Sequence, residues 1–452
     1  MFYEEFETNF YNALKEHLDG NYPIEVYQSL LRDEPNNSIL KYLLAHSYYM
    51  TGNTEASDLL YDEAVKMNSN IDFPKDFSNI EQVIIVAFST LLTKENPYIN
   101  EVFEKALASN LVWDFSYANT GAMYLGNCDL SNAYKVAMQG FEKFPASPYI
   151  RKLVYLTLLK SRNIAGAWGF YEDKVRELDE KSDKFYMQKP IYDFSDRKAR
   201  VYVYSNGSLS DTLFFSRYIK PLEEEGVNIL LDMPEELYPL FKMSNYKMNV
   251  LKPDLDEFDY RISMMSLPYL FKTSLENIPQ KDGYIKPDET KYMYYNQTYF
   301  LTEKKKVGFT WNNDYNKEEL KTTMILEDFV PLFEDTDIQF YSLKQDLTQE
   351  EKDILFQYNI VDLGSTFKDY ADCAAAIANT DIFIGSPSLM LDISAALGHK
   401  TIVNVPPSTD WQWGIWEEQT PWYSNVRVLR QKQAGNIGEV VERIKELNLL
   451  KI

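Results

Sequence analysis

Two different patterns of hydrophobic and small residues divide the chain near residue 190. Before that point, small residues recur at a spacing of 34 residues, as from Ala106 to Gly140 and from Ala133 to Ala167. From Arg200 onward, short runs of β-branched and aromatic residues alternate with helix-like segments, which is typical of a parallel α/β sheet. The pattern therefore predicts an all-helical part followed by an α/β part.

The spacing of the first part resembles that of the tetratricopeptide repeat, in which each unit is a hairpin of two helices. Its Ala and Gly positions let two helices approach closely, and aromatic residues fill the gap beside them. Because one hairpin cannot bury its own apolar face, the repeats must stack, and stacking creates a concave surface for an extended partner. The phase shifts between Ala64 and Ala106, so we expect about four or five imperfect repeats. A generic helical bundle is the alternative.

The runs in the α/β part predict two sheets. The expected strands are residues 200–204, 227–231 and 260–264 in the first sheet, and residues 306–311, 338–343, 360–363, 381–385, 401–405 and 426–430 in the second. Residues 278–302 between them are polar and contain Pro279, Gly283 and Pro287, so we interpret them as a link. Two doubly wound domains would place a cleft at the carboxyl ends of both sets of strands.

These patterns predict three domains. Residues 1–190 would form the helical repeats, residues 191–300 a first Rossmann-like domain, and residues 301–452 a second Rossmann-like domain.

The composition of the chain limits the classes of partner that it can bind. The 68 acidic residues exceed the 46 basic residues and give a net charge of −22, which opposes general binding to nucleic-acid phosphates or anionic lipid. The longest apolar run, residues 83–92, is about half the length of a membrane span, and the acidic N-terminus does not resemble a signal peptide. We expect a cytoplasmic protein with no nucleic-acid partner and no membrane span.

Histidine and cysteine are scarce. The chain has three His and two Cys, which excludes His-rich metal sites, HExxH proteases and a disulfide framework. We expect neither a metal nor an organic cofactor.

Several segments resemble one enzyme family in their order and spacing. They are residues 207–218, 266–268, 278–279, 372–376, 381–384, 396–398, 410–413, 421–423 and 427–431. Together they resemble the bacterial and phage-type tetratricopeptide-repeat glycosyltransferases, which are related to heptosyltransferases and to O-linked N-acetylglucosamine transferases. The resemblance implies an all-α tetratricopeptide-like superhelix followed by an α/β GT-B fold of two Rossmann-like domains.

The resemblance also implies an activity. A member of this family would transfer a sugar from a nucleoside-diphosphate sugar to a protein or glycan acceptor selected by the groove of the repeats. An oligomer is compatible with this architecture.

The second Rossmann-like domain would hold the donor. Ser386 and Pro387 suit the N-cap and the first position of a helix, whose free first-turn amides would face a diphosphate. Ser388 follows them. The alternative is an ordinary capped helix. The family carries a His one turn into this helix, where this chain has Asp392. A carboxylate repels a diphosphate, so either Asp392 turns to a sugar hydroxyl or the site no longer binds a nucleotide sugar.

Other residues are candidates for donor binding because of where they fall in the resemblance. Lys321 and Thr322 lie beside the family's Arg-Ser pair, and Lys344 replaces its Gln; a solvated lysine is the alternative reading of each. Trp311 and Trp411 would stack on a base or sugar, or else pack in the core. Asp372 lies in a matching segment, and Arg427 lies on a strand where it faces either the cleft or solvent.

Asp211 is the candidate catalytic base, because it matches the position of the base in the related heptosyltransferases. Its alternative role is the N-cap of a helix over residues 212–222. The residue before it is Ser210, where the family has Gly.

A second interpretation treats the chain as a catalytically degenerate GT-B and repeat protein that acts as a protein-binding scaffold. Pro387, Asp392, Ser210 and Asn313 favour it, because they replace family residues in the loops that would carry the chemistry. A third is a lectin-like carbohydrate binder that uses the tryptophans at residues 411–422.

Overall fold

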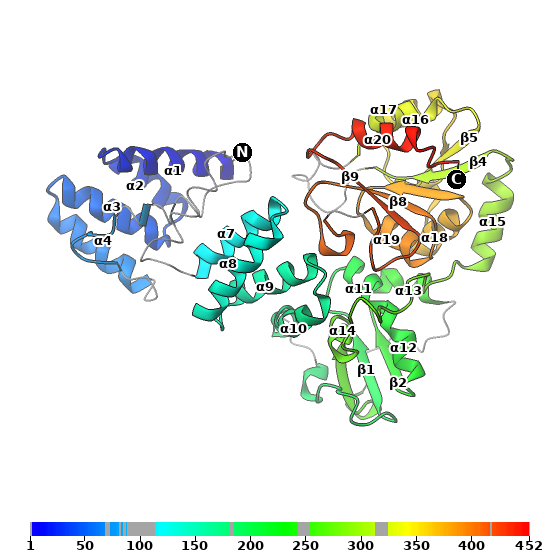
Figure 1. The fold of residues 1–452 in the computed structure, drawn as a ribbon, viewed down its shortest axis with the longest axis horizontal. Coiled ribbons are helices and arrows are strands. Elements are labelled where there is room, and N and C mark those ends of the chain that lie inside the picture. The colour runs from blue at the N-terminus through cyan, green and yellow to red at the C-terminus, as the bar shows by residue number, and fades with distance from the viewer. Residues whose placement is uncertain are drawn as a thin grey trace. The chain divides into compact units, whose positions relative to one another are not determined.

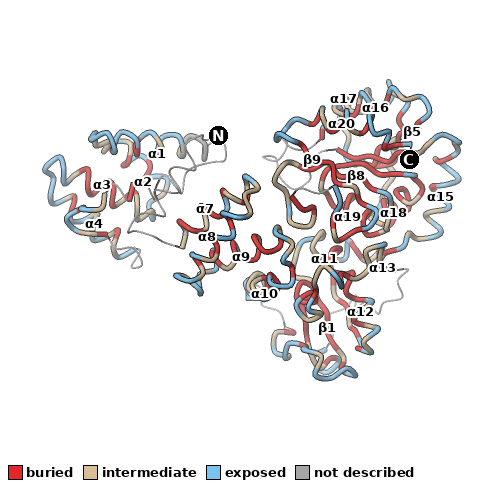
Figure 2. Tube along the Cα trace, in the orientation of Figure 1, coloured by how far each residue is buried: buried red, intermediate tan, exposed pale blue. Residues whose placement is uncertain are grey.

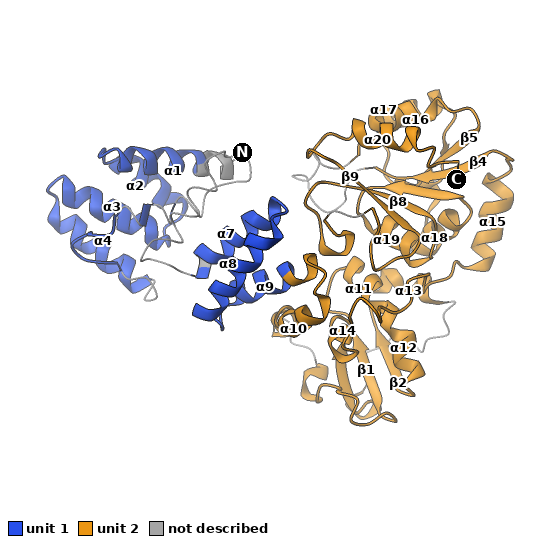
Figure 3. Cartoon of the chain, in the orientation of Figure 1, with its two compact units in different colours: residues 1–157 blue, residues 158–452 orange. Residues whose placement is uncertain are grey.

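The computed structural model describes residues 2–67, 73–80, 83–84, 87, 114–180, 185–242, 254–311, 324–415 and 418–451. The chain divides into two compact units, residues 1–157 and residues 158–452 (Figure 3), and each is described by itself. Within the described residues, no helix has both the length and the apolar composition that crossing a membrane requires.

Unit 1 is helical, as the sequence predicts. Its helices are α1 (Phe2–Leu18), α2 (Ile24–Asp33), α3 (Ser38–Met50), α4 (Thr54–Met67), α7 (Asp114–Gly126), α8 (Leu130–Lys143) and α9 (Pro148–Lys160), the last of which crosses into unit 2 (Figure 1). α3 packs on α4, and α7 packs on α8.

Small residues let these helices approach each other. A Cβ added to Gly140 on α8 would lie 2.9 Å from the Cβ of Tyr117 on α7, so only glycine fits there. Ala133 and Ala137 on the same helix are buried. The structural role predicted for the small residues is confirmed at these positions, while Ala106 lies outside the described residues.

Two histidines are buried together in unit 1. His17 on α1 bonds through Nε2 to Nδ1 of His46 on α3 at 2.7 Å, and its Nδ1 lies 2.9 Å from the hydroxyl of Tyr27 on α2. Burial lowers the pKa of both imidazoles below the ordinary range, and for His17 the neighbouring His46 adds to this effect. The pair is therefore neutral when folded and joins three helices.

The first sheet of unit 2 is parallel, in the order β2-β1-β3. Its elements are α10 (Ile164–Glu180), η1 (Phe185–Gln188), β1 (Arg200–Tyr204), α11 (Leu209–Phe215), η2 (Ser216–Tyr218), α12 (Ile219–Glu224), β2 (Asn228–Asp232), η3 (Glu235–Leu237), α13 (Tyr238–Phe241), η5 (Leu255–Glu257), β3 (Tyr260–Ser263), η6 (Met264–Ser266) and α14 (Leu267–Leu270). One face buries Tyr202 and Tyr204 against Tyr186 and Phe258.

The second sheet is also parallel, in the order β6-β5-β4-β7-β8-β9. Its elements are α15 (Glu289–Tyr299), β4 (Lys305–Phe309), α16 (Leu326–Phe333), β5 (Ile338–Ser342), α17 (Gln349–Gln357), β6 (Val361–Asp362), η8 (Gly364–Thr366), α18 (Tyr370–Ala378), β7 (Ile382–Gly385), α19 (Leu389–Ala396), β8 (Thr401–Val405), η9 (Trp411–Trp413), β9 (Val426–Arg430) and α20 (Gly438–Glu446). Each predicted strand is present, and its ends differ from the prediction by at most two residues.

Helices cover both faces of the second sheet. α16, α17 and α20 share one apolar core with the strands, while α18 and α19 lie on the other face (Figure 1). Burial is concentrated in the strands and in the helix faces turned toward them (Figure 2). This double layer explains why the strands read as continuous hydrophobic runs.

The order of the second sheet creates a topological switch point. The chain runs outward from β4 to β6 and then returns to place β7 on the other side of β4. The connections after β4 and β7 therefore leave the sheet in opposite directions, and in open α/β sheets ligands bind outside the carboxyl ends of such strands.

The segment predicted as a polar link is structured. It contains α15, and the backbone N–H groups of Tyr284 and Ile285 donate to the carbonyl of Ala396 at the end of α19. Gly283 and Gly398, both with positive φ, meet backbone to backbone at this contact. The polar composition suggested a solvated linker, but the backbone hydrogen bonds dock it on the second sheet.

Unit 1 should lose stability in mild acid because of the histidine pair. In the unfolded chain both imidazoles recover their ordinary pKa, so the unfolded state binds more protons as the pH falls below about 6.5. The stability from these groups is present above that pH and is lost below it, by on the order of 1–2 kcal/mol per histidine by pH 5. Hydrogen exchange of peptides from α1 to α3 at pH 7.5 and pH 5 measures this loss. His46→Gln should reduce the acid dependence, and an unchanged dependence in that variant would refute the assignment.

Candidate functional site

The candidate site lies where helices from the two sheets begin next to each other. α11 follows β1 of the first sheet, α19 follows β7 of the second, and the two helices pack together. Both helices start at the carboxyl ends of parallel strands, so their first turns bring backbone amides and short polar side chains to one place.

The start of α19 differs from the prediction. Ser388, not Ser386, is the N-cap: its backbone is extended and its Oγ accepts from the N–H of Leu391 at 3.3 Å. The hydroxyl of Ser386 instead accepts from the N–H of Met324 at 3.1 Å. Pro387 therefore precedes the helix rather than opening it. Several consecutive cap-forming residues made the start ambiguous from the sequence.

Asp392 lies in the first turns of α19 and is 5% exposed. Burial, together with the charges of Asp410 and Asp211, raises the pKa of its carboxyl to about 7. The nearby Ser210 side chain and the charge of Arg217 lower the pKa of Asp392 and so act in the opposite direction.

Asp211 caps α11, but not as predicted. The helix begins at Leu209, Ser208 is its N-cap, and Asp211 completes a capping box. Its Oδ2 accepts from the N–H of Ser208 at 3.2 Å and from the hydroxyl of Ser208 at 3.0 Å. Its Oδ1 lies 3.8 Å from Nζ of Lys174 on α10. The helix begins three residues before the predicted start at residue 212, because Ser208 and Asp211 form a capping box.

Arg217 is fully buried beside this site. Nε donates to the carbonyl of Phe214 at 3.0 Å, and Nη1 donates to the carbonyl of Trp422 at 2.8 Å. The guanidinium also lies over the rings of Phe214, Tyr284, Trp422 and Tyr423, 4.3 to 5.5 Å from their centroids. Arg217 thus joins η2 to the segment that follows η9.

Trp411 belongs to an aromatic cluster at the same place. Its ring meets those of Trp168, Phe214 and Trp422 edge to face, at centroid distances of 5.2 to 6.1 Å. These contacts match the packing alternative for Trp411. Trp416, from the same stretch, lies outside the described residues.

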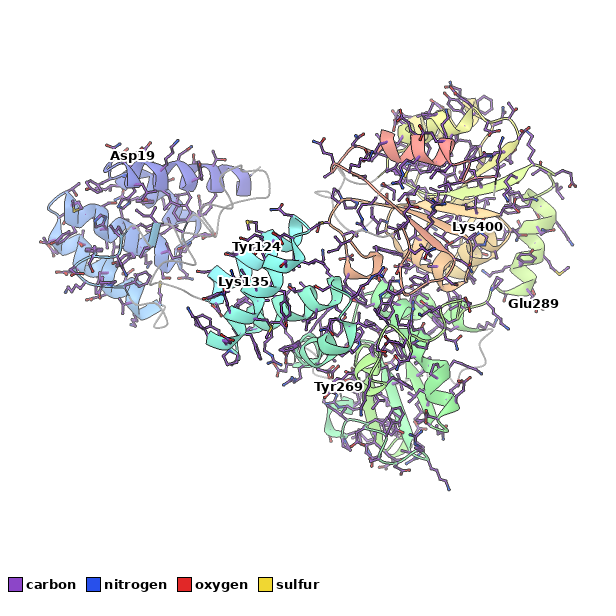
Figure 4. All side chains as sticks on the ribbon, in the orientation of Figure 1. Asp19, Tyr124, Lys135, Tyr269, Glu289 and Lys400 are labelled. Atoms are coloured by element: carbon purple, nitrogen blue, oxygen red, sulfur yellow. The ribbon has the colours of Figure 1, made fainter. Side chains whose placement is uncertain are left out.

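α10 adds acidic residues that the sequence reasoning missed. Oε2 of Glu172 accepts from the hydroxyl of Ser266 at 2.9 Å, and burial raises the pKa of Glu172 to about 7. Asp179 accepts from the hydroxyl of Tyr204 at 2.7 Å and pairs with Arg261 at 3.2 Å. α10 also packs along α14, which carries Tyr269 (Figure 4).

A sequence signal for Asp179 existed. It follows Tyr171 and Val175 at a spacing of four, on the buried face of α10, and a carboxylate on the apolar face of a helix requires a buried partner.

Trp311 and Lys344 come together at the carboxyl ends of β4 and β5. Nζ of Lys344 lies 5.1 Å above the Trp311 ring and 2.6 Å from Oε1 of Glu351. The indole N–H of Trp311 donates to the same oxygen at 2.7 Å. Glu351 was not a sequence candidate, and it holds both predicted residues.

The remaining candidates are engaged elsewhere. Asp372 accepts from Nζ of Lys291 on α15 and from the N–H of Lys368, each at 2.8 Å. Arg427 on β9 pairs with Glu418 at 2.7 Å. Lys321 and Thr322 lie outside the described residues. In the described part of the chain, no group of three or more His, Cys, Asp or Glu side chains is arranged to hold a metal ion.

Replacing Arg217 by Lys should destabilise unit 2 by about 3 kcal/mol, because a lysine retains the buried charge but loses the planar stacking and the two-point bonding. Urea unfolding followed by tryptophan fluorescence reports it, since Trp168, Trp411 and Trp422 surround the site. Arg176→Lys, at an exposed ion pair on α10, is the matched control and should change little. Equal midpoints for the two variants would contradict this role of Arg217.

Comparisons with known proteins complete the description of the site. No protein-family model and no curated protein sequence matches the chain.

Among solved structures, a glycosyl transferase of family 9 from Veillonella parvula matches 55% of this chain and 89% of its own, with 14% identity and a TM-score of 0.40. The ADP-heptose lipopolysaccharide heptosyltransferase II of E. coli matches 56% of this chain and 98% of its own, with 12% identity and a TM-score of 0.40. An O-GlcNAc transferase mutant from Thermobaculum terrenum matches 99% of this chain and 94% of its own, with 10% identity and a TM-score of 0.27. We infer no activity from likenesses at this level.

Proposed function

We propose that the chain is a glycosyltransferase of the GT-B class that moves a sugar from a nucleoside-diphosphate sugar to a protein or glycan acceptor. One observation carries the proposal: α11 and α19, which follow strands of two different parallel sheets, pack together and carry Asp211 and Asp392 in their first turns. Two sheets that present their strand ends to one place offer one side to a donor and the other to an acceptor.

The donor would bind at the switch point of the second sheet. Gly385 ends β7 there, and a Cβ on it would lie 2.9 Å from Cγ2 of Thr310, so the backbones of the two connections approach closely. The first-turn amides of α19, capped by Ser388, suit a diphosphate. Trp311 follows β4 and suits stacking on the nucleobase of a donor, and Lys344 follows β5 and suits its phosphate.

The other donor-binding residues predicted from the sequence are also part of the proposal. Ser386 anchors the loop before α19, and Trp411 packs in the aromatic cluster behind it. Asp372 and Arg427 already form ion pairs. Lys321 and Thr322 stay predictions.

The chemistry requires a base for the acceptor and neutralisation of the leaving diphosphate. Asp211 is the predicted base. Helix amides and lysine would supply the positive potential, so we expect no requirement for a metal. The repeats of unit 1 would select the acceptor.

A protein-binding scaffold is the competing function, and two observations favour it. Lys344 is already neutralised by Glu351, and the carboxylate of Asp211 is already bonded to Ser208. Both side chains would have to exchange partners for catalysis.

Donor binding separates the two functions. UDP-, GDP-, ADP- and CMP-sugars, titrated by calorimetry with and without EDTA, should include one that binds, and EDTA should not change its affinity. Lys344→Ala should weaken that binding about ten-fold, whereas Lys400→Ala, at an exposed lysine before β8 (Figure 4), should not. If none of the sugars binds, the scaffold function replaces the enzyme.

Removal of unit 1 tests the role of the repeats. A chain lacking residues 1–157 retains α10, which packs into unit 2. It should bind the donor with nearly unchanged affinity but lose most transfer to acceptors in a lysate, measured with a radiolabelled donor. Full transfer by the shortened chain would refute acceptor selection by the repeats.

A further inference from the structure

Asp179, near the end of α10, is the centre of a buried hydrogen-bond network beside β1 and β3. Its Oδ2 accepts from the hydroxyl of Tyr204 at 2.7 Å and from Nη1 of Arg261 at 3.2 Å. Its Oδ1 accepts from Nδ2 of Asn206 at 2.8 Å. Asp179, Tyr204 and Arg261 are buried, so water competes little for these bonds. The network therefore fixes α10 against the first sheet at a defined point.

Asn206 carries the network into the loop between β1 and α11. Its Nδ2 donates to Asp179 on one side, and its Oδ1 accepts from the hydroxyl of Ser263, the last residue of β3, at 2.6 Å on the other. The amide of Asn206 thus uses its donor and its acceptor in opposite directions. Aspartate has the same shape but no donor when ionised, so the loop depends on asparagine at this position.

The next residues leave the loop little freedom to shift. A Cβ added to Gly207 would lie 2.7 Å from Cβ of Asp211 and 2.9 Å from Sδ of Met265, so the loop backbone is pressed against both side chains. Ser208 then forms the capping box with Asp211, in which the N–H of Asp211 donates to Oγ of Ser208 at 3.0 Å. The position of the Asp211 carboxylate therefore follows from the position of residues 206–208.

α10 also faces Asp211 directly, through Lys174. Nζ of Lys174 lies 3.8 Å from Oδ1 of Asp211, and it donates to the hydroxyl of Tyr171 at 3.3 Å. The ammonium lies 5.3 Å from the centroid of the Tyr171 ring, so it is held close to its own helix. Oδ2 of Asp211 is bonded to Ser208. One oxygen of the carboxylate is thus placed by α11, and the other faces α10.

We propose that α10 is the positioning element of the acceptor side of the site: Asp179 fixes the loop before α11 through Asn206, and Lys174 orients the carboxylate of Asp211. This inference rests on the proposed glycosyltransferase function, in which Asp211 is the base. Asp179 and Lys174 are positioning residues, because they act through Asp211. Both lie in the part of the sequence predicted as helical repeats, so the last helix of that part serves the site.

Positioning and simple anchorage of α10 predict different results. A misplaced base lowers the rate of the chemical step, since a displacement of about 1 Å costs about 10²-fold in rate. The donor affinity stays the same, because the proposed donor contacts come from the second sheet and α19. If α10 were only an anchor, its variants would change the stability and leave the turnover of the folded chain unaltered.

The experiment uses point variants of the full chain. Asn206→Asp removes the donor to Asp179 and places a second carboxylate beside it. Asp179 itself is left intact, because its loss would leave Arg261 buried without its counter-ion. Lys174→Met removes the charge but keeps the bulk of the side chain, and Lys174→Arg keeps the charge. Arg176→Met is the matched control, because it removes a cation from an exposed ion pair on the same helix.

Two readouts are measured. The first is hydrogen exchange of the backbone N–H groups of residues 205–212, including that of Asp211, which needs no ligand. The second combines donor affinity by calorimetry with the rate of nucleotide release from UDP-, GDP-, ADP- and CMP-sugars, with water as acceptor. Urea unfolding shows that each variant is folded under the conditions of both readouts.

We expect Asn206→Asp to speed up exchange of the Asp211 N–H about ten-fold, as for the loss of one hydrogen bond, and to lower turnover by about 10²-fold. Lys174→Met should lower turnover about ten-fold, and Lys174→Arg should restore most of it, because a cation again faces the carboxylate. Donor affinity should not change in these variants. Arg176→Met should match the wild type in every readout.

Three outcomes would overturn the inference. They are wild-type exchange of the Asp211 N–H in Asn206→Asp, equal turnover in Lys174→Met and Arg176→Met, and a fall in donor affinity that accounts for the whole loss of turnover. If the wild-type chain turns over none of the donors, the proposed function fails, and the positioning of a base fails with it. The exchange readout then shows separately whether α10 fixes the loop.

Discussion

Arg217 carries a formal charge in a place that excludes water, and the arrangement of unit 2 follows from how that charge is accommodated. Burying an isolated ion costs several kcal/mol. The chain offsets this cost with two backbone carbonyls and four aromatic faces, which come from α11, from the segment after η9 and from the segment before α15. The guanidinium therefore ties the end of α11 to the segment after η9 and to the segment before α15.

That contact determines the electrostatics of the candidate site. Burial and the charges of Asp410 and Asp211 raise the pKa of Asp392, while the charge of Arg217 acts in the opposite direction. Asp211 is only a short distance away along the same contact, yet it is surrounded by donors. Two carboxyl groups of the same kind are thus placed in different surroundings by their neighbours.

The large-scale organisation followed from the sequence, because it rests on repeated local patterns. The strand positions came from runs of β-branched residues, and the helical first part came from small residues such as Ala133 and Gly140. Helix starts were less certain. Ser386 and Ser388 are both good caps, as are Ser208 and Asp211, and the choice among them depends on which backbone conformation the neighbouring strand imposes. No local pattern in the sequence indicates that residues 278–302 dock on α19.

By itself, the sequence determined the two kinds of architecture and the strands, because periodicity and residue type are local properties. It named Ser210 and Asp392 separately, as unrelated departures from a family pattern. Only the tertiary structure decided that their helices, α11 and α19, pack together, that Glu351 holds Trp311 and Lys344, and that α10 brings Glu172 and Asp179 to the first sheet. The physical reason is that a pKa or a hydrogen bond depends on what lies across a contact, and contacts between segments far apart in the sequence, such as α11 and α19, are set by the packing of the whole unit.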